Sequence, residues 1–442
     1  MPQSTIRRLL PVAVLYSGRI AIAALGLVIL PWLSRAMPAE QFGLATTVLA
    51  LQSLAVVLDL GLSVTIAREF PVLVGAHKHR DLMRRSERAL FLIYLAVGTL
   101  AVALAAAGAV PIPPSTALIV CLSLLLIVWQ NIIVVAFISR QRFVTSTAIQ
   151  FTSLLLRHGC SLGFVIVFGG TVQVFVLGQL TGAAIVLAVS RLVFVWQHRG
   201  RTPATADQAR GADATSIAVM IYTIAGACAM QFDKVLLSAL ASPTDTGPYF
   251  LASTLSLVPI TFLASPVSQF VQPKLIASLA AGQHDEARRW VVRLTLAIIA
   301  CAVMPGVALG LLAPWLVPLW LHGSVHQSTV SAYTTLLMPG ASIGALGLVP
   351  AIVLIARRDY RAMAMISCTL AVLVLTTTAW LARHDAITGV CIVYAIYHTL
   401  AAAALWWRAA RIEPWFGSRF AFGPRVANGA PKPTARQPAS QL

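Results

Sequence analysis

The chain is dominated by apolar runs about as long as a membrane-spanning helix. Crossing the hydrocarbon core of a bilayer takes roughly 20 apolar residues, and backbone in lipid must satisfy its own hydrogen bonds, which favours helices. Several connectors between the runs are very short, such as PIPPS at 111–115. The predicted spans cover residues 11–33, 42–66, 89–110, 115–138, 146–168, 172–195, 216–240, 248–272, 291–312, 328–355, 362–382 and 386–407. The sequence therefore predicts an all-α polytopic membrane protein with about 12 transmembrane helices.

The longest polar interruption divides these spans into two sets of six. It covers residues 196–215, is rich in Arg, Ala, Thr and Asp, and is expected to be a cytoplasmic linker. Six spans on each side enter the membrane in the same orientation, which permits a parallel pseudo-repeat about an axis along the membrane normal. The openings of the second and eighth spans, FGLATTVLALQSL and TGPYFLASTLSLVPI, are faintly alike. We therefore expect two six-helix lobes, 1–195 and 216–407, followed by a disordered cytoplasmic tail, 408–442.

The positive charge gathers in alternate connectors. The formal net charge is +18, but the connectors predicted to lie opposite the termini hold only Arg35 and Arg383. This is the positive-inside pattern, so both termini of the multi-pass chain are expected in the cytoplasm. Topology and contact with anionic membrane lipids explain the charge, and nucleic-acid binding is not expected. Two basic amphipathic segments, 70–90 and 271–291, are expected to lie at the headgroup boundary.

Five ionisable side chains fall well inside the predicted spans: Arg19, Asp59, Arg157, Asp233 and Lys234. A charge near mid-membrane costs about 2.5–3.5 kcal/mol on insertion scales, so it normally faces a cavity or a partner. Structural explanations exist for each of them. Arg19 can reach the cytoplasmic headgroups through its long stem. Arg157 can pair with Asp59 or with helix carbonyls, and Asp233 and Lys234 can pair with neighbours near the outer end of their span.

A functional explanation places all five side chains around one cavity. Three cations then outweigh two carboxylates, and the low dielectric of the interior strengthens the attraction for an anion. Arg can bind a phosphate group through paired hydrogen bonds. On this hypothesis Arg19, Arg157 and Lys234 bind substrate. Asp59 and Asp233 couple or gate transport by protonation or ion binding.

Signatures of catalysis or of a resident metal are sparse. The six cysteines lie in predicted spans without a CxxC pair, and are expected to pack as small apolar residues. His322 and His326 are four residues apart, but no Cys or carboxylate cluster accompanies them. No HExxH, GxSxG or phosphate-binding Gly-rich lysine motif occurs. We therefore expect neither an enzyme nor a cofactor.

Small residues and prolines within the spans indicate helix packing and bending. Four GxxxG pairs are expected at close helix contacts, and several intramembrane prolines are expected to bend their helices. The glycine pairs are Gly159 with Gly163, Gly178 with Gly182, Gly306 with Gly310, and Gly340 with Gly344. The prolines are Pro259, Pro266, Pro305, Pro339 and Pro350.

Two stretches resemble a known family. LPWLSRAMPAEQFGLATTVLALQSL with LDLGLSVTIAREF, and QFDKVLLSALASPTDTGPYFLAS with PKLIASLAAGQHDEARR, are similar to bacterial polysaccharide and O-antigen flippases. These flippases belong to the multidrug/oligosaccharidyl-lipid/polysaccharide exporter superfamily. The resemblance implies a two-lobed bundle that rocks between inward-open and outward-open states. It also implies a substrate, an oligosaccharide joined to undecaprenyl pyrophosphate, which moves from the cytoplasmic to the outer leaflet of the bacterial inner membrane.

The resemblance extends to individual residues and to partners. The positions that match the family pattern are Asp59, Gly61, Arg68, Asp233, Gly43 and Gly247. Other membrane proteins of polysaccharide assembly are the expected protein partners. Two alternatives stay open. A multidrug extruder of the same superfamily would favour a carboxylate-rich cavity, and a membrane glycan polymerase or ligase would be expected to carry a long outer loop with catalytic groups.

Overall fold

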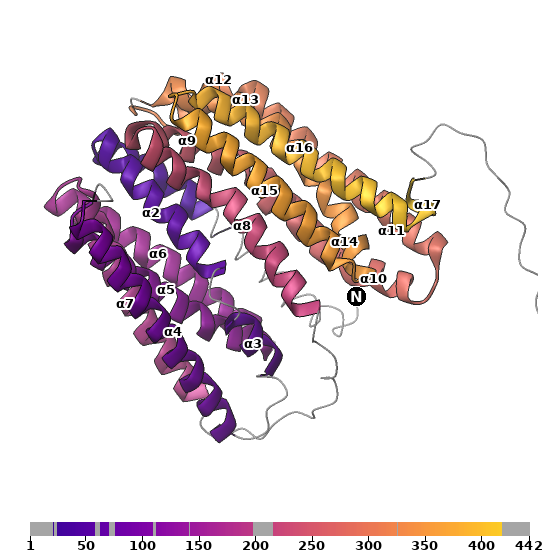
Figure 1. Cartoon of the computed structure of the whole chain (residues 1–442), viewed down its shortest axis with the longest axis horizontal. Coiled ribbons are helices and arrows are strands. Elements are labelled where there is room, and N and C mark those ends of the chain that lie inside the picture. The colour runs from indigo at the N-terminus through magenta and orange to yellow at the C-terminus, as the bar shows by residue number, and fades with distance from the viewer. Residues whose placement is uncertain are drawn as a thin grey trace, which may run out of the picture.

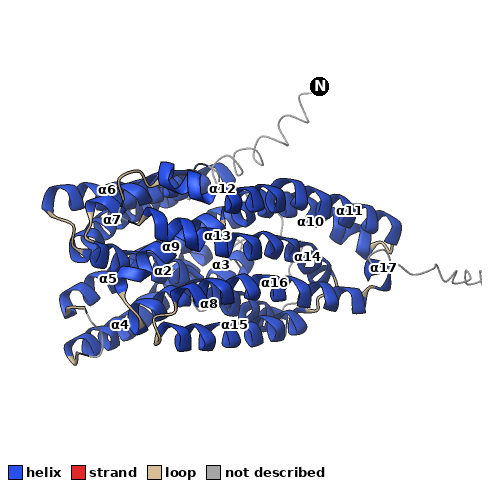
Figure 2. Cartoon of the chain, turned by 90° about the horizontal axis from the view of Figure 1, so that it is seen from above, coloured by secondary structure: helices blue, strands red, loops and turns tan. Residues whose placement is uncertain are grey.

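The computed structural model describes residues 21, 24–57, 62–69, 76–108, 112–140, 142–197, 215–324 and 326–417 of the chain. Every regular element in this part is a helix (Figure 2). An apolar helix, Ala24–Ala36, comes first. Before the linker follow α2 (Ala39–Val57), α3 (Leu62–Glu69), α4 (Ala76–Ala106), α5 (Pro114–Ser139), α6 (Phe143–Phe168) and α7 (Val172–Gln197). After it come α8 (Thr215–Leu240), α9 (Pro243–Ser256), α10 (Ser265–Ala280), α11 (His284–Ile298), α12 (Met304–Trp320), α13 (Gln327–Gly344), α14 (Leu348–Ala356), α15 (Tyr360–Ala382), α16 (Ile387–Ile412) and α17 (Pro414–Gly417).

The number of membrane helices agrees with the sequence. Nine helical stretches of the described chain are long and apolar enough to cross a bilayer, and each corresponds to one predicted span. The other three predicted spans correspond to Ala24–Ala36, to α2 and to the region from α9 to α10. The prediction of about 12 membrane helices is confirmed.

Two helices, α4 and α16, extend beyond their apolar runs into basic residues. α4 begins at Ala76, so most of the first basic segment is continuous with a membrane helix instead of forming a separate surface helix. The second basic segment is divided, because α10 ends at Ala280 and α11 begins at His284. α16 likewise runs on past the predicted lobe boundary at 407. Hydrophobicity marks only the part of a helix that lies in lipid, whereas Lys and Arg are good helix formers and let it continue. Residues 198–214 and 418–442, most of the predicted linker and tail, lie outside the described part.

Glycine and proline shape the helices largely as expected. Three of the four GxxxG pairs lie at tight contacts: a Cβ on Gly178 would lie 2.5 Å from Ser161 Cα, one on Gly310 2.9 Å from Met338 Cβ, and one on Gly340 2.3 Å from Ala395 Cα. Cβ atoms on Gly159 and Gly163 would meet nothing within 4 Å, so that pair is not a packing contact. Pro259 opens a π-helical turn, η1 (Pro259–Ala264), and a second one, η2 (Ile299–Val303), ends two residues before Pro305. A 3₁₀ turn, η3 (Ala345–Gly347), separates α13 from α14. A proline without an N–H breaks the regular hydrogen-bond ladder at such places.

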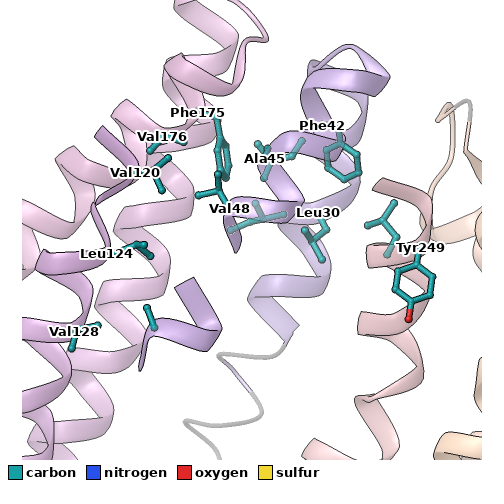
Figure 3. Packing of buried hydrophobic residues seen from close by; sticks show 14 of the residues in the cluster. Leu30, Phe42, Ala45, Val48, Val120, Leu124, Val128, Phe175, Val176 and Tyr249 are labelled. Carbon is teal, nitrogen blue, oxygen red and sulfur yellow. The ribbon is translucent and has the colours of Figure 1, made fainter. Parts of the chain in front are cut away.

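The helices form two groups that meet at one end of the molecule. Figure 1 shows α3 to α7 on one side and α8 to α16 on the other, with α2 between them. α2 packs more extensively on α8 and α9 than on α5 and α7 of its own half. One hydrophobic core joins the two groups and includes Phe42 of α2 with Leu237 and Tyr249 of the second group. Phe42 lies on the side of α2 that faces α9, as Figure 3 shows. A second core belongs to the second group alone, and the far ends of the two groups diverge (Figure 1).

Two ends can therefore be distinguished. We call the end where α2 and α9 begin the closed end, and the end with the basic α10–α11 and α14–α15 turns the basic end. At the closed end, Trp320 Nε1 donates to Leu27 O at 2.7 Å, from the second group to the first. The rings of Phe42 and His326 stack there with centroids 6.3 Å apart and planes 22° apart. These contacts hold the two groups together at the closed end.

The buried His326 makes the stability of the fold dependent on pH. Its side chain is almost fully buried, and burial lowers its pKa below the ordinary value of 6.5, an effect that the nearby Asp245 partly opposes. The imidazole of His326 binds a proton more readily in the unfolded chain than in the folded one. The contribution of neutral His326 to the free energy of unfolding is therefore complete above about pH 6.5 and is lost as the pH falls through and below that value. We expect the melting temperature of the purified protein to drop more between pH 8 and pH 5 than that of His326→Gln. Equal drops would show that another group sets the dependence.

Candidate functional site

Arg157 occupies the middle of α6 and lines a cavity between the two groups of helices. The cavity measures about 340 Å³ and is bounded by the helix Ala24–Ala36, α2, α5 and α6, with Phe250 of α9 as its contribution from the second group. Most of its lining is apolar. The polar members are Gln52, Ser53, Arg157 and His158.

The guanidinium of Arg157 has few partners. Its Nη1 donates to Gln52 Oε1 at 3.4 Å, a long hydrogen bond. Its Nε is buried with no hydrogen-bond acceptor in the described chain, and Gln52 Nε2 has none either. None of the ion pairs among described residues includes Arg157. A buried cation without a carboxylate is costly, so an anion that enters the cavity gains strongly from it.

Close packing of α7 fixes the position of Arg157. A Cβ on Gly182 would lie 2.6 Å from Arg157 Cα, so only glycine allows α7 to approach α6 at this level. One turn away, Gln179 Nε2 lies 3.4 Å from His158 Nδ1. The guanidinium therefore extends from a backbone held in place by its neighbour helix.

Asp233 and Lys234 form a second polar site, inside the second group. Lys234 Nζ lies 3.0 Å from Asp233 Oδ1, and Tyr249 donates its hydroxyl proton to Asp233 Oδ2 at 2.7 Å. Lys234 also donates to Met230 O at 2.5 Å. Both charged side chains are buried. A cavity of about 20 Å³ adjoins them, large enough for about one water molecule.

An aromatic cluster surrounds this pair and connects three helices. Tyr249 of α9 packs edge to face on Tyr394 of α16, with centroids 6.3 Å apart. Tyr394 donates to Ala229 O in α8 at 2.6 Å. The polar pair thus lies where α8, α9 and α16 meet, and a change of its charge would act on all three helices.

The predicted site residues do not all come together. Arg19, Asp59 and Gly61 lie outside the described residues. Arg157 and the pair Asp233 and Lys234 line different cavities, which share no residue. Within the described chain the charge of Lys234 is balanced by its neighbour, so the cation available to a ligand is Arg157.

Other polar residues were not predicted from the sequence. Gln52 is a polar residue in the middle of a predicted span, a signal that could have identified it. Arg191 of α7 forms a bidentate ion pair with Glu87 of α4. Its Nη1 donates to Oε1, and its Nη2 donates to Oε2 at 2.9 Å. Trp129 Nε1 also donates to Glu87, at 3.2 Å. This pair neutralises a charge between membrane helices and has a structural role.

Solved structures with the same fold include membrane transporters. The chain is similar to the lipid II flippase MurJ in an inward closed conformation, with a TM-score of 0.69 at 12% identity over 90% of this chain and 87% of that one. It is similar to the inward-facing conformation of a multidrug resistance MATE family transporter of the MOP superfamily, with a TM-score of 0.68 at 13% identity over 91% and 98%. The outward-facing conformation of a MATE family transporter gives 0.59 at 13% identity over 92% and 96%. These three structures are of a flippase and of multidrug transporters.

One of the two sequence comparisons identifies a family. No curated protein sequence matches the chain. Residues 11–278, more than half of the chain, match the sequence model of a family described as polysaccharide biosynthesis protein. The matched region includes every residue that lines the Arg157 cavity and part of the lining of the cavity beside Asp233 and Lys234. The chain belongs to this polysaccharide biosynthesis protein family, with the two-lobed helical fold of MOP superfamily transporters.

Proposed function

We propose that this protein is a flippase that moves an oligosaccharide linked to undecaprenyl pyrophosphate from the cytoplasmic to the outer leaflet of the bacterial inner membrane. The observation that carries the proposal is the guanidinium of Arg157, which lines a cavity between the lobes with its Nε buried and has no carboxylate partner in the described chain. Arg binds phosphate oxygens through paired hydrogen bonds, and the pyrophosphate supplies the missing anion. The lipid tail stays in the bilayer while the polar head crosses.

The conformation fits the first half of an alternating-access cycle. The charge pattern supports an orientation with the closed end on the outer side of the membrane and the basic end in the cytoplasm. The lobes share a core that includes their closed ends and diverge toward the basic end (Figure 1). The higher TM-score against the inward-facing transporter than against the outward-facing one supports the same assignment. In this state the cavity receives substrate from the cytoplasmic leaflet.

The remaining predicted residues receive roles in the same scheme. Arg19 is a second cation for the substrate, and Asp59 and Asp233 are coupling groups. Protonation of Asp233 would release Lys234 for a phosphate, because the two side chains now bind each other. Anionic lipids contact the basic end, and membrane proteins of polysaccharide assembly receive the product.

Reconstitution in liposomes tests the proposed function. A fluorescent undecaprenyl-pyrophosphate oligosaccharide is followed between leaflets with a membrane-impermeant quencher, beside a neutral polyprenyl glycan of the same sugar chain. We expect the purified protein to move the anionic lipid and leave the neutral one in place. Equal movement of both would contradict a cationic site. Lengthening of the sugar chain would indicate a glycan polymerase or ligase, and movement of a cationic drug instead would indicate a multidrug extruder.

A further inference from the structure

Two glycines allow the lobes to touch at the closed end without side chains between them. A Cβ on Gly43 of α2 would lie 1.5 Å from Pro243 O and 2.4 Å from Pro243 C in α9. A Cβ on Gly247 of α9 would lie 2.8 Å from Phe42 Cδ1 and 3.7 Å from Gly43 Cα. All three distances under 3.0 Å are closer than real Cβ atoms approach. Any other residue at Gly43 would have to displace the backbone of the opposite lobe.

The two glycines occupy equivalent places in the two halves of the chain. α2 begins at Ala39 and α9 at Pro243, so each glycine lies four residues after its helix begins. Each contacts the first turns of the other helix. The crossing is thus nearly symmetric, as expected if the two halves are related by a parallel repeat.

The crossing is also connected to the buried charge pair. Tyr249, which donates to Asp233, lies two residues beyond Gly247 on the same helix. A shift of α9 that follows a change at Asp233 therefore reaches Gly247 directly. On the other side, Phe42 contacts both Gly247 and the stacked ring of His326.

We infer that the crossing of α2 and α9 at Gly43 and Gly247 is the outer gate of the transporter, a contact that closes in the inward-facing state and separates in the outward-facing state. This inference rests on the proposed function. A gate must part and reform in every cycle, and contacts between small residues allow close van der Waals packing with little interlocking of side chains. A larger residue at Gly43 holds the gate apart and favours the outward-facing state.

Distances between spin labels test the gate without reference to transport. In a cysteine-free background, one label pair at Gln173 and His384 reports on the closed end, and another at Arg80 and Arg289 reports on the basic end. We expect Gly43→Ala to lengthen the first distance and shorten the second. The ratio of outside-closed to outside-open molecules should fall about 5- to 150-fold, the range that corresponds to an ordinary overpacking penalty.

Matched variants separate a gate from a general packing defect. Gly159→Ala introduces the same methyl group into a membrane helix at a point where no atom of the described chain lies within 4 Å, and should leave both distances unchanged. The methyl group added by Gly247→Ala meets the Phe42 ring, so a second substitution in the same protein, Phe42→Ala, should restore the closed state. The same Phe42→Ala should not restore Gly43→Ala, whose clash is with backbone.

The outcomes of these experiments test the gate and the proposed substrate separately. Unchanged closed-end distances in both Gly43→Ala and Gly247→Ala would overturn the gate, even for a working flippase. Rescue of Gly43→Ala by Phe42→Ala would overturn the backbone contact on which the inference depends. Separation of the labels in a protein that moves no lipid-linked glycan would keep the gate and reject the proposed substrate.

Discussion

Arg157→Ala is expected to reduce the movement of the lipid-linked pyrophosphate between leaflets about 10- to 100-fold. A charge-assisted hydrogen bond contributes about 1.5–3 kcal/mol, and the guanidinium can form two of them with a phosphate. Arg157→Lys keeps the charge but loses the paired geometry, so its rate should fall between those of the wild type and Arg157→Ala. The liposome assay described above measures all three rates.

The thermal stability of the same variants shows whether Arg157 serves substrate or fold. Breaking a buried ion pair destabilises a protein strongly, because the partner charge is left behind. In the described chain Arg157 has no carboxylate partner, so Arg157→Ala should keep or raise the melting temperature. Arg383→Ala, an exposed arginine at the closed end, is the control for the loss of one positive charge. Normal transport by both Arg157 variants, or a large loss of stability without a transport defect, would contradict the substrate role.

The positions of the membrane helices could be predicted from the sequence because the bilayer imposes a length that is visible locally. The ends of α8, for example, lie within a residue of the predicted span. The continuity of the basic start of α4 with its membrane helix could not be predicted, because hydrophobicity does not register a helix that continues beyond the lipid. Such continuity depends on helix propensity and capping, which a hydropathy pattern does not measure.

The grouping of charges could not be predicted in the same way. Asp233 and Lys234 are adjacent in sequence, and adjacent residues on a helix point in different directions. The long Lys234 side chain nevertheless reaches back to Asp233 and to Met230 O. Glu87 and Arg191 are more than 100 residues apart, and only the packing of α4 and α7 on α5 brings them together. Which intramembrane charges share a cavity is decided by contacts between helices, and these leave no mark in one sequence.

Asp233→Ala is expected to destabilise the protein by about 3–5 kcal/mol, the usual cost of leaving one member of a buried ion pair without its partner. Lys234 would remain almost fully buried with Met230 O as its hydrogen-bond acceptor, and Tyr249 would lose the acceptor of its hydroxyl proton. The loss should appear as a large drop in the melting temperature of the purified protein. Lys234→Met alone should cost a similar amount, because it leaves the carboxylate uncompensated.

The double variant Asp233→Ala with Lys234→Met decides whether the pair exists for stability or for function. Replacement of a whole buried ion pair by apolar residues is often neutral or stabilising, so most of the melting temperature should return. If the pair couples transport to an ion gradient, this folded protein should still move the glycolipid down its own gradient. It should no longer accelerate when a proton or sodium gradient is imposed across the liposome. A double variant that responds to those gradients like the wild type would exclude Asp233 as the coupling group. Additive losses in the two single variants and the double variant would show that the side chains act independently.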